Sequence, residues 1–303
     1  MTKTSKTIVF FGSGPVAAAS LALLARSFQI EAVITKPRPP HHKGSVPTLE
    51  LAEQLHLPII TATNKKELSL ALANQSFISQ VAVLIDFGII VSQDVIDTFP
   101  LGIINSHFSL LPQLRGADPI TFAILEGLSQ TGVSLMLLVE SMDEGPLLAQ
   151  APYDIADNVT TPKLTEKLIE VSATALETIL PEYINGTIQP VQQTGVPTYS
   201  RKLTKEDGIL DFTKPALQLE REIRAYQPWP KSHATIAGKE VVITCAHVVP
   251  GDQDPGQIST IQKELYIGTA NGILVIDRLK PAGKSEMTTE AFLAGYGQAL
   301  RKP

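Results

Sequence analysis

The sequence predicts an α/β fold: a doubly wound, mostly parallel, Rossmann-like sheet followed by a smaller C-terminal domain with an OB-like β-barrel. Over the first two thirds of the 303 residues, short runs that are apolar at nearly every position alternate with helical patterns. This alternation is typical of a parallel sheet with helices on both faces. Towards the C-terminus, short strands broken by "AGK" and "ANG" turns indicate a small antiparallel barrel.

The elements follow in chain order. Four strand and helix pairs are predicted at 7–12 with 15–27, 31–36 with 48–56, 81–88 with 92–99, and 101–107 with 118–127. Two more strands follow at 131–142 and 147–156, and a long amphipathic helix at 160–184 begins with Thr-Pro. We therefore expect a catalytic domain over residues 1–188.

The segment 189–205 has low periodicity and several Gly, Pro and Gln residues, so we expect an interdomain linker there. The second domain is predicted over 206–303. Its expected elements are a helix at 216–227, strands within 232–249 and 263–282, and a last helix at 289–300.

Composition limits the function classes. A hydrophobic content of 44% with 18% charged residues is typical of a folded globular chain. The single cysteine, Cys245, excludes an internal disulfide, so a reducing compartment is expected and the cytoplasm is the default. No apolar run approaches the ~18 residues that a membrane-spanning helix needs, and no signal peptide is expected.

The charge is uneven along the chain. The net charge of −5 argues against a protein that coats nucleic acid indiscriminately. Residues 1–200 carry 11 Lys and Arg against 18 Asp and Glu, whereas residues 201–303 carry 14 against 12. The C-terminal third is therefore the better place for a polyanion to bind.

Two polar side chains end the strand predicted at 101–107. Asn105 and His107 are two residues apart, so both point to the same face of the strand. In open parallel sheets the ligand crevice lies beyond the carboxyl ends of the strands. An amide beside an imidazole can stabilise a carbonyl oxygen that becomes negative during attack, which suits acyl transfer.

A carboxylate follows the next predicted strand. Asp143 lies in a "MDEG" turn from which it could reach His107. The structural alternative is that Asn105 caps the loop, that His107 is a satisfied buried histidine and that Asp143 only forms the turn. The residues alone leave both interpretations open.

The segments "INSHFSLLPQLRGADPI" and "MDEGPLL" resemble the signature of the folate-dependent formyltransferases. The resemblance covers nearly the whole chain. It extends to "VFFGSGPVAAASLALL" near the N-terminus, "TYSRKLTKEDGILDF" at the linker, and "IRAYQPWPKS" and "NGILVIDRLKPAGKSEM" in the C-terminal third. The last two stretches are far more specific than Asn-x-His alone.

The resemblance implies a reaction and its residues. Asn105, His107 and Asp143 match the catalytic triple of the family, the formyl donor would be 10-formyltetrahydrofolate, and the acceptor would be initiator methionyl-tRNA. Asn105 and His107 would stabilise the tetrahedral oxyanion, while Asp143 orients His107 and helps to move the proton. The alternatives are an amino-sugar-nucleotide formyltransferase, which shares the triple, and a folate- or tRNA-binding protein without turnover.

The resemblance also implies where folate binds. The matching segments are the loop Ser109, Leu110, Leu111 and Pro112 and the strand end Phe87, Gly88 and Ile89. Asp86 and Phe87 stand where a small residue and a tyrosine are usual. Leucines in a loop are otherwise more often core residues than ligand contacts.

Basic residues of two regions are candidate phosphate contacts. The Pro-rich loop at 35–47 matches a loop that enters the acceptor stem in relatives acting on tRNA, although it is shorter here. The candidates in this loop and in the C-terminal domain are Lys36, Arg38, Lys43, Arg221, Arg224, Lys280 and Lys284. Taken singly, each is as easily a solvated charge.

Three further sequence features do not indicate a bound cofactor or metal. The "GSGPVA" stretch has the spacing of a dinucleotide fingerprint, but the second strand ends in Thr35 and Lys36 instead of the carboxylate that a ribose needs, so no NAD is expected. Cys245 and His247 lack further ligands, so no metal is expected. Trp229 is expected to pack. We also expect a monomer with no membrane association.

Overall fold

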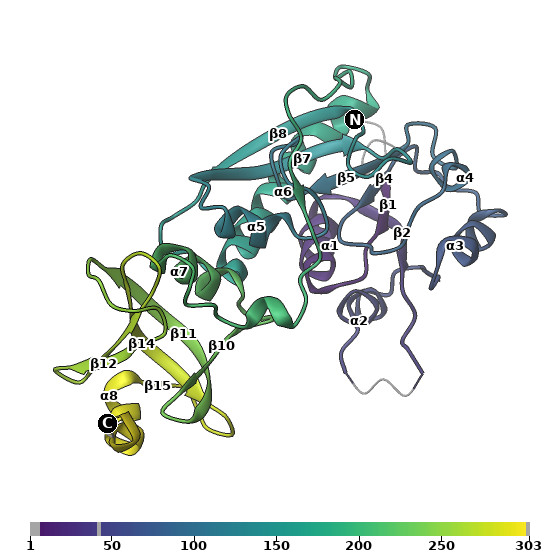
Figure 1. Cartoon of the computed structure of the whole chain (residues 1–303). Helices are drawn as coiled ribbons and strands as arrows, with labels where there is room; N and C mark the ends of the chain where they lie inside the picture. Colours follow the sequence, from purple (N-terminus) through teal and green to yellow (C-terminus); the bar gives the residue numbers. More distant parts are fainter. Residues whose placement is uncertain (1–6, 41–43, 301–303) are drawn as a thin grey trace. The chain divides into compact units, whose positions relative to one another are not determined.

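A computed structural model describes residues 7–40 and 44–300 (Figure 1). The chain forms two compact units. The first comprises Met1–Pro119, Gln130–Asp154 and Thr165–Ser200, and the second comprises Ile120–Ser129, Ile155–Leu164 and Arg201–Pro303. Two short segments that precede the predicted linker in sequence thus belong to the second unit.

The first unit contains a seven-stranded sheet. Its strands are β1 (Thr7–Phe11), β2 (Gln29–Thr35), β3 (Ile59–Thr61), β4 (Ala82–Leu84), β5 (Ile103–His107), β7 (Gln130–Leu137) and β8 (Leu147–Asp154). The spatial order is β3-β2-β1-β4-β5-β7-β8. The first five strands in this order pair in parallel, whereas β7 is antiparallel to both β5 and β8. The chain reverses its direction of progress across the sheet beside β1, so the ligand crevice is expected at the neighbouring carboxyl ends.

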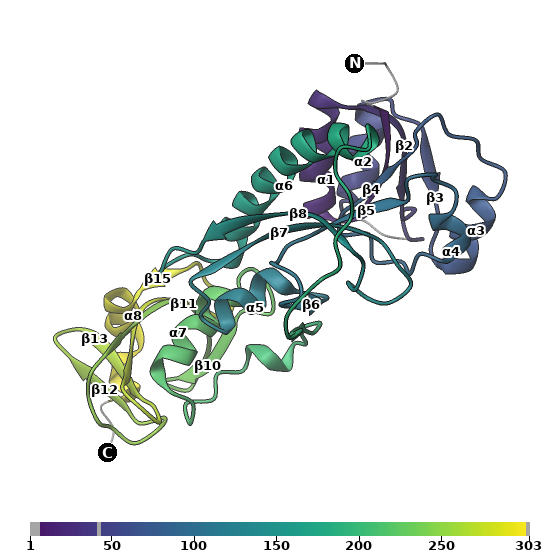
Figure 2. The same ribbon diagram turned by 90° about the horizontal axis from the view of Figure 1, so that it is seen from above.

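The apolar runs become buried strands because helices cover them. All five residues of β1 are buried, and each large apolar side chain removed from water contributes about 1.5–3 kcal/mol. The helices of this unit are α1 (Pro15–Ser27), α2 (Pro47–Gln54), α3 (Lys65–Leu72), α4 (Gln93–Ile96) and, from Thr165 onwards, α6 (Thr161–Ile184). α1 and α6 lie side by side, joined by a hydrogen bond of 2.5 Å from Ser27 Oγ to Glu177 Oε1 (Figure 2).

The second unit contains a six-stranded antiparallel sheet. Its elements are α5 (Pro119–Leu125), α7 (Ala216–Ala225), α8 (Thr289–Tyr296), β10 (Ser232–Ile236), β11 (Lys239–Val249), β12 (Ile258–Ile261), β13 (Glu264–Gly268), β14 (Ile273–Pro281) and β15 (Met287–Thr288). The order is β10-β11-β14-β13-β12, with β15 beside β14. Leu219 and Ile223 of α7 and Phe292 of α8 pack into the apolar core of this sheet.

The predicted fold class is confirmed: a parallel-dominated α/β unit is followed by separate antiparallel β structure. The sequence patterns did not reveal β3 and α3, nor the two-residue strands β6 (Arg115–Gly116) and β9 (Tyr199–Ser200), which pair in parallel. The three strands are too short to show periodicity. Among the described residues, no helix is long and apolar enough to cross a bilayer.

Candidate active site

The end of β5 carries the two polar side chains singled out in the sequence. In the sheet register, Asn105 lies beside Leu84 of β4 and beside Met136 of β7, so both neighbours are apolar strand residues. Asn105 is 9% exposed and His107 is 6% exposed. Burial at this depth means that each polar group needs a partner, because an unpaired polar atom away from water costs free energy.

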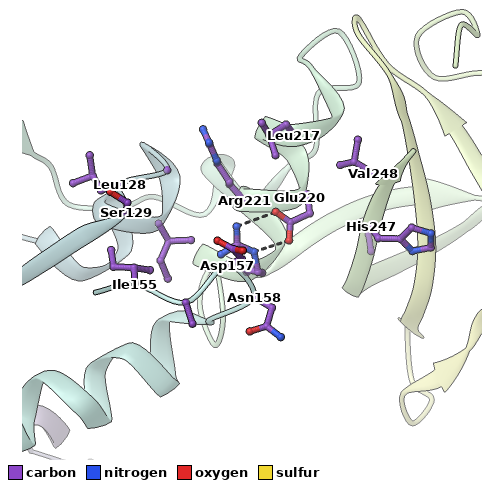
Figure 3. Close-up of a pocket in the computed structure, with 15 residues that line it drawn as sticks. Leu128, Ser129, Ile155, Asp157, Asn158, Leu217, Glu220, Arg221, His247 and Val248 are labelled. Carbon is purple, nitrogen blue, oxygen red and sulfur yellow. Dashed lines mark hydrogen bonds and ion pairs between the residues drawn. The ribbon is translucent and has the colours of Figure 1, made fainter. Parts of the chain in front are cut away.

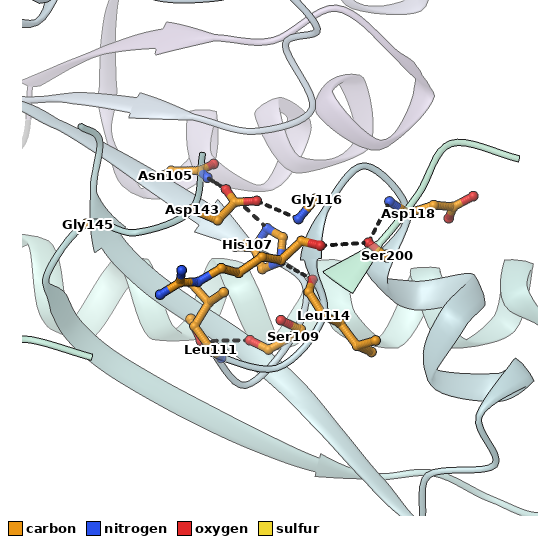
Figure 4. A network of polar contacts seen from close by, with 12 residues as sticks. Asn105, His107, Ser109, Leu111, Leu114, Gly116, Asp118, Asp143, Gly145 and Ser200 are labelled. Atoms are coloured by element: carbon orange, nitrogen blue, oxygen red, sulfur yellow. Dashed lines mark hydrogen bonds and ion pairs between the residues drawn. The ribbon is translucent and has the colours of Figure 1, made fainter. Parts of the chain in front are cut away.

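Asp143 is the hydrogen-bond partner of Asn105 and lies beside the imidazole of His107 (Figure 4). Asn105 Nδ2 donates to Asp143 Oδ1 over 3.4 Å, and His107 Nδ1 lies 3.7 Å from the same oxygen. The other carboxylate oxygen accepts a hydrogen bond of 2.8 Å from the backbone N–H of Gly116. The three residues predicted from the sequence are therefore brought together around one carboxylate oxygen.

The imidazole of His107 is fixed from its other side. His107 Nε2 is 2.9 Å from the carbonyl oxygen of Leu114. A carbonyl oxygen can only accept, so Nε2 carries the proton. In the neutral imidazole, Nδ1 is then the free nitrogen, and it faces Asp143.

The loop after β5 is anchored by a buried serine. Ser134 Oγ donates to Ser109 O over 2.7 Å and accepts from Leu111 N over 2.9 Å. Ser109 and Leu111 are buried, whereas Leu110 and Pro112 are partly exposed. Of the predicted folate segment, Leu110 and Pro112 are the two residues with accessible apolar surface.

In the segment 87–89, which follows β4, the main chain is better placed than the side chains to contact a ligand. The Phe87 ring is 2% exposed and packs edge-on against Phe11 with centroids 5.4 Å apart, so its side chain belongs to the core. Gly88 has a φ of +67°, and Ile89 packs against the same core cluster. Any ligand contact from Phe87 is therefore left to its main chain.

Asp86 is an unusual residue at this edge. Its φ of +47° lies in the left-handed region, which an aspartate tolerates better than most residues. Partial desolvation raises the pKa of the Asp86 carboxyl, and the positive charge of Lys36 partly opposes this. The Lys36 side chain also lies close to Gly88: a Cβ added to this glycine would be 3.0 Å from Lys36 Nζ.

The basic loop after β2 is partly neutralised. Arg38 pairs with Glu50 at 2.9 Å and donates to Gly44 O at 3.2 Å. Hydrogen bonds from Ser45 and from Arg38 lower the pKa of Glu50 to about 2. Lys43, predicted to contact tRNA, lies outside the described residues.

Arg221 and Arg224 of α7 line a cavity of about 510 Å³ in the second unit (Figure 3). Arg224 is held by Glu220 through two bonds of 2.5 and 2.9 Å, and it donates to Val159 O over 3.0 Å. The guanidinium of Arg221 packs against Gly127: a Cβ added to this glycine would be only 2.0 Å from Arg221 Cζ. The N–H groups of Arg224 are thus largely used in hydrogen bonds to Glu220 and Val159.

The lysines of the antiparallel sheet are accessible. Lys280 and Lys284 are exposed, and Lys280 lines a cavity of about 300 Å³ together with Lys231 and His233. Trp229 is 52% exposed, so the expectation that it packs was wrong. The Pro-Trp-Pro context fixes the turn but does not provide a partner for the ring.

Sequence reasoning missed several polar residues beside the site. Arg115 is 9% exposed, pairs with Glu144 at 2.8 Å and donates to Gln193 Oε1 at 2.9 Å. Gln193 came from the segment predicted as a linker. No local pattern distinguishes these residues, because each contact joins positions far apart in the chain.

No metal centre emerges from the described residues, in which no group of three or more His, Cys, Asp or Glu could hold an ion. His247 Nδ1 instead pairs with Asp277 at 3.0 Å, and Cys245 Sγ lies 3.7 Å from the same carboxylate. Burial raises the pKa of the Cys245 thiol, and the charge of Asp277 adds to this effect. The thiol is therefore poorly suited to ligation or nucleophilic chemistry.

Comparison with known proteins defines the class. The formyl transferase family model matches residues 6–180, and the model of the formyl transferase C-terminal domain matches residues 202–297. The chain belongs to the formyl transferase family and is a formyl-transferring enzyme.

Curated relatives cover nearly the whole length. The chain is 35% identical over 295 residues to the methionyl-tRNA formyltransferase of Myxococcus xanthus, covering 95% of each chain. It is also 35% identical over 301 residues to that of Roseiflexus castenholzii, covering 96% of each.

Solved structures share the fold at lower identity. An N-formyltransferase from Helicobacter canadensis, in complex with folinic acid and dTDP-3-aminofucose, matches with a TM-score of 0.67 and 19% identity over 89% of this chain and 98% of that one. HypX from Aquifex aeolicus, in complex with tetrahydrofolic acid, matches with a TM-score of 0.65 and 15% identity. That match covers 97% of this chain but only 47% of HypX.

Proposed function

We propose that this chain transfers the formyl group of 10-formyltetrahydrofolate to the α-amine of initiator methionyl-tRNA. Methionyl-tRNA formyltransferases that are 33–35% identical over almost the full length support this acceptor. The observation that carries the proposal is the meeting of Asn105, His107 and Asp143 at the carboxyl end of β5, in a chain that matches both family domains.

The reaction is an acyl transfer between two nitrogens. The free α-amine of the aminoacyl group attacks the formyl carbon, so a new C–N bond forms and the carbonyl oxygen becomes an oxyanion. The bond between this carbon and N10 of the folate then breaks. One proton must leave the attacking amine and another must reach N10, which requires a group that can accept and return a proton.

The three site residues divide this work. Asn105 Nδ2, which lies 3.4 Å from Asp143, can turn to donate to the oxyanion. His107 keeps its Nε2 on Leu114 O and offers Nδ1 to the reacting group, donating when it is protonated. Asp143, held by the N–H of Gly116, accepts the proton of the amine and stabilises the protonated imidazole.

The folate contacts follow from which surfaces are accessible. The apolar faces of Leu110 and Pro112 would pack against the flat pterin, while the main chain of Phe87, Gly88 and Ile89 would hydrogen-bond its edge. Ser109 and Leu111 would act from beneath, because both are buried and hold the loop in shape. Tetrahydrofolic and folinic acids bound to the two fold relatives support a folate donor.

The tRNA contacts are proposed at the exposed cations. Lys280 and Lys284 are exposed in the second unit, and Lys36 and Arg221 are partly exposed. Arg38 and Arg224 would contact phosphates only through N–H groups that Glu50 and Glu220 leave free. Lys43 completes the proposed set. We further propose that the protein is a monomer, which light scattering tests. We also propose that it acts in the cytoplasm, which cell fractionation tests.

The deciding experiment offers purified protein two acceptors with formyl-labelled donor. Label in methionyl-tRNA and none in an amino-sugar nucleotide supports the proposal, and the reverse assigns the protein to the sugar formyltransferases. A binding protein without turnover would bind folate but label neither acceptor. Replacing Asn105, His107 and Asp143 one at a time, with turnover and folate affinity both measured, separates chemistry from binding.

A further inference from the structure

The segment predicted as a plain linker is bonded along its length to the loops of the candidate active site. At Val191 it forms a two-way backbone bridge with Leu147 of β8, with N···O distances of 2.7 and 2.8 Å. At Tyr199–Ser200 it forms β9 and pairs with β6. We call residues 191–200 the strap.

Gln193 of the strap forms two hydrogen bonds to the Asp143 loop and a third to Arg115 of β6. Its Nε2 donates to Asp143 O over 2.7 Å and to Gly145 O over 2.8 Å. Its Oε1 accepts from Arg115 Nη2 over 2.9 Å. One side-chain amide therefore fixes the main chain on both sides of Glu144, and Arg115 in turn pairs with Glu144 at 2.8 Å.

The Asp143 loop needs such support. Asp143 has a φ of +54°, a left-handed conformation that aspartate tolerates better than most residues but that is still uncommon and costs free energy. Gly145 is packed so closely that a Cβ would lie 1.7 Å from Leu137 O. The direction of the Asp143 carboxylate therefore depends on where the main-chain carbonyls of Asp143 and Gly145 are held.

The strap also holds the residue that supports His107. Thr198 Oγ1 accepts from Leu114 N over 2.9 Å, and Thr198 N donates to Pro112 O over 3.2 Å. The carbonyl of Leu114 is the acceptor for His107 Nε2. Both the imidazole and the carboxylate of the site thus depend on hydrogen bonds from one short segment.

We propose that Gln193 is a positioning residue that orients Asp143 for proton transfer, and that the strap is part of the catalytic apparatus of the first unit. This inference rests on the proposed function, since it assumes that the Asp143 carboxylate acts in formyl transfer. The two donated hydrogen bonds of Gln193, rather than its contact with Arg115, carry the effect.

The test compares three variants in steady-state and single-turnover formylation of methionyl-tRNA. Gln193→Met keeps the length of the side chain but removes all three bonds, and it is expected to lower kcat about 10- to 100-fold at an unchanged KM for tRNA. Gln193→Glu keeps the acceptor for Arg115 but cannot donate, and should lose at least as much. The exposed neighbour provides the matched control, Gln192→Met, expected to stay within about twofold of wild type.

A double-mutant cycle separates positioning from general stability. In an Asp143→Asn background the carboxylate no longer acts, so adding Gln193→Met should lower the residual rate by less than about twofold. Circular dichroism and folate binding establish that each variant is folded, and if Gln193→Met does not fold, Gln193→Glu carries the same comparison.

Wild-type kcat in Gln193→Met, recovery in Gln193→Glu, or full additivity with Asp143→Asn would each overturn the proposal. These outcomes are distinct from failure of the proposed function, in which the wild-type protein itself would leave methionyl-tRNA unlabelled.

Discussion

At the scale of single residues, the chemistry depends on which atoms of the site remain free. The carbonyl of Leu114 fixes the proton of His107 on Nε2, and Gly116 N occupies one oxygen of Asp143. What remains is Nδ1 of the imidazole, together with the amide of Asn105 and the second oxygen of Asp143, which share one long hydrogen bond of 3.4 Å. These three groups can respond to a substrate without breaking a bond that holds the loops.

The amide of Asn105 is the first prediction. Asn105→Ala should lower kcat by about 10²- to 10³-fold, because one donor to the oxyanion is lost, while the KM values change little. Asn105→Asp should be worse at neutral pH, since a second carboxylate would face Asp143 across the present 3.4 Å. Its activity should partly recover as the pH is lowered and one carboxyl becomes protonated.

Steady-state rates measured from about pH 5 to 9 for both variants test this prediction. A suitable control is Ser172→Ala, which removes a buried hydroxyl that bonds to Ser106 Oγ on the opposite face of β5 over 2.7 Å. Equal kcat values for Asn105→Ala and wild type would show that Asn105 takes no part in the reaction.

At the scale of elements, the loop after β5 depends on Ser134 of β7. Its hydroxyl is fully buried and satisfies Ser109 O and Leu111 N. Ser134→Ala would leave both without this partner, at a cost of about 1–3 kcal/mol in the free energy of unfolding. Because the loop carries the proposed folate surface, KM for the folate donor should rise more than KM for tRNA.

Thermal unfolding and the two KM values check this prediction. Ser172→Ala again serves as the matched control: it should lower stability without a selective change in folate KM. If Ser134→Ala loses stability but keeps its folate KM, the loop does not form the folate surface.

The second unit contains a buried carboxylate whose charge opposes folding. Glu222 of α7 is 2% exposed and pairs with Lys214 at 2.7 Å. Burial raises the pKa of Glu222 despite the opposing effect of Lys214. The folded unit therefore favours the protonated form, so stability falls as the pH rises from about 4.5, the unfolded value, through the raised folded value.

Glu222→Gln should remove this fall, because the amide does not titrate. Urea unfolding at a series of pH values, followed by the fluorescence of Trp229, the only tryptophan in the chain, measures the slope. Glu240→Gln, at an exposed site on β11, is the control that should keep the wild-type slope. An unchanged slope in Glu222→Gln would place the pH dependence elsewhere.

The strand periodicities explain why much of the fold could be predicted. β5 has a period of two, so Asn105 and His107 had to share a face, and the apolar runs had to be buried. Gln193 could not be found in this way, because its bond to Asp143 O spans 50 positions and no pattern encodes such a contact. The exposure of Trp229 was missed for a related reason: neighbouring prolines shape a turn but do not determine what covers the ring.

At the scale of the whole molecule, charge determines where a polyanion can bind. The chain is acidic overall, yet residues 201–303 carry a small excess of positive charge. Lys280, on β14, is exposed and lines a cavity with Lys231 and His233. A cation in such a position gains from releasing counterions bound to tRNA, so its contribution should depend on salt.

Lys280→Ala should therefore raise KM for methionyl-tRNA and leave kcat and folate KM unchanged. The dependence of tRNA affinity on the logarithm of salt concentration should lose about one unit of slope, as expected for one phosphate contact. Lys263→Ala is the matched control: Lys263 is also an exposed lysine of the second unit, but it pairs with Glu290 at 2.6 Å. If both variants lose the same slope, general charge attracts the tRNA. If the salt dependence of tRNA affinity in Lys280→Ala equals that of wild type, the tRNA does not contact this part of the sheet.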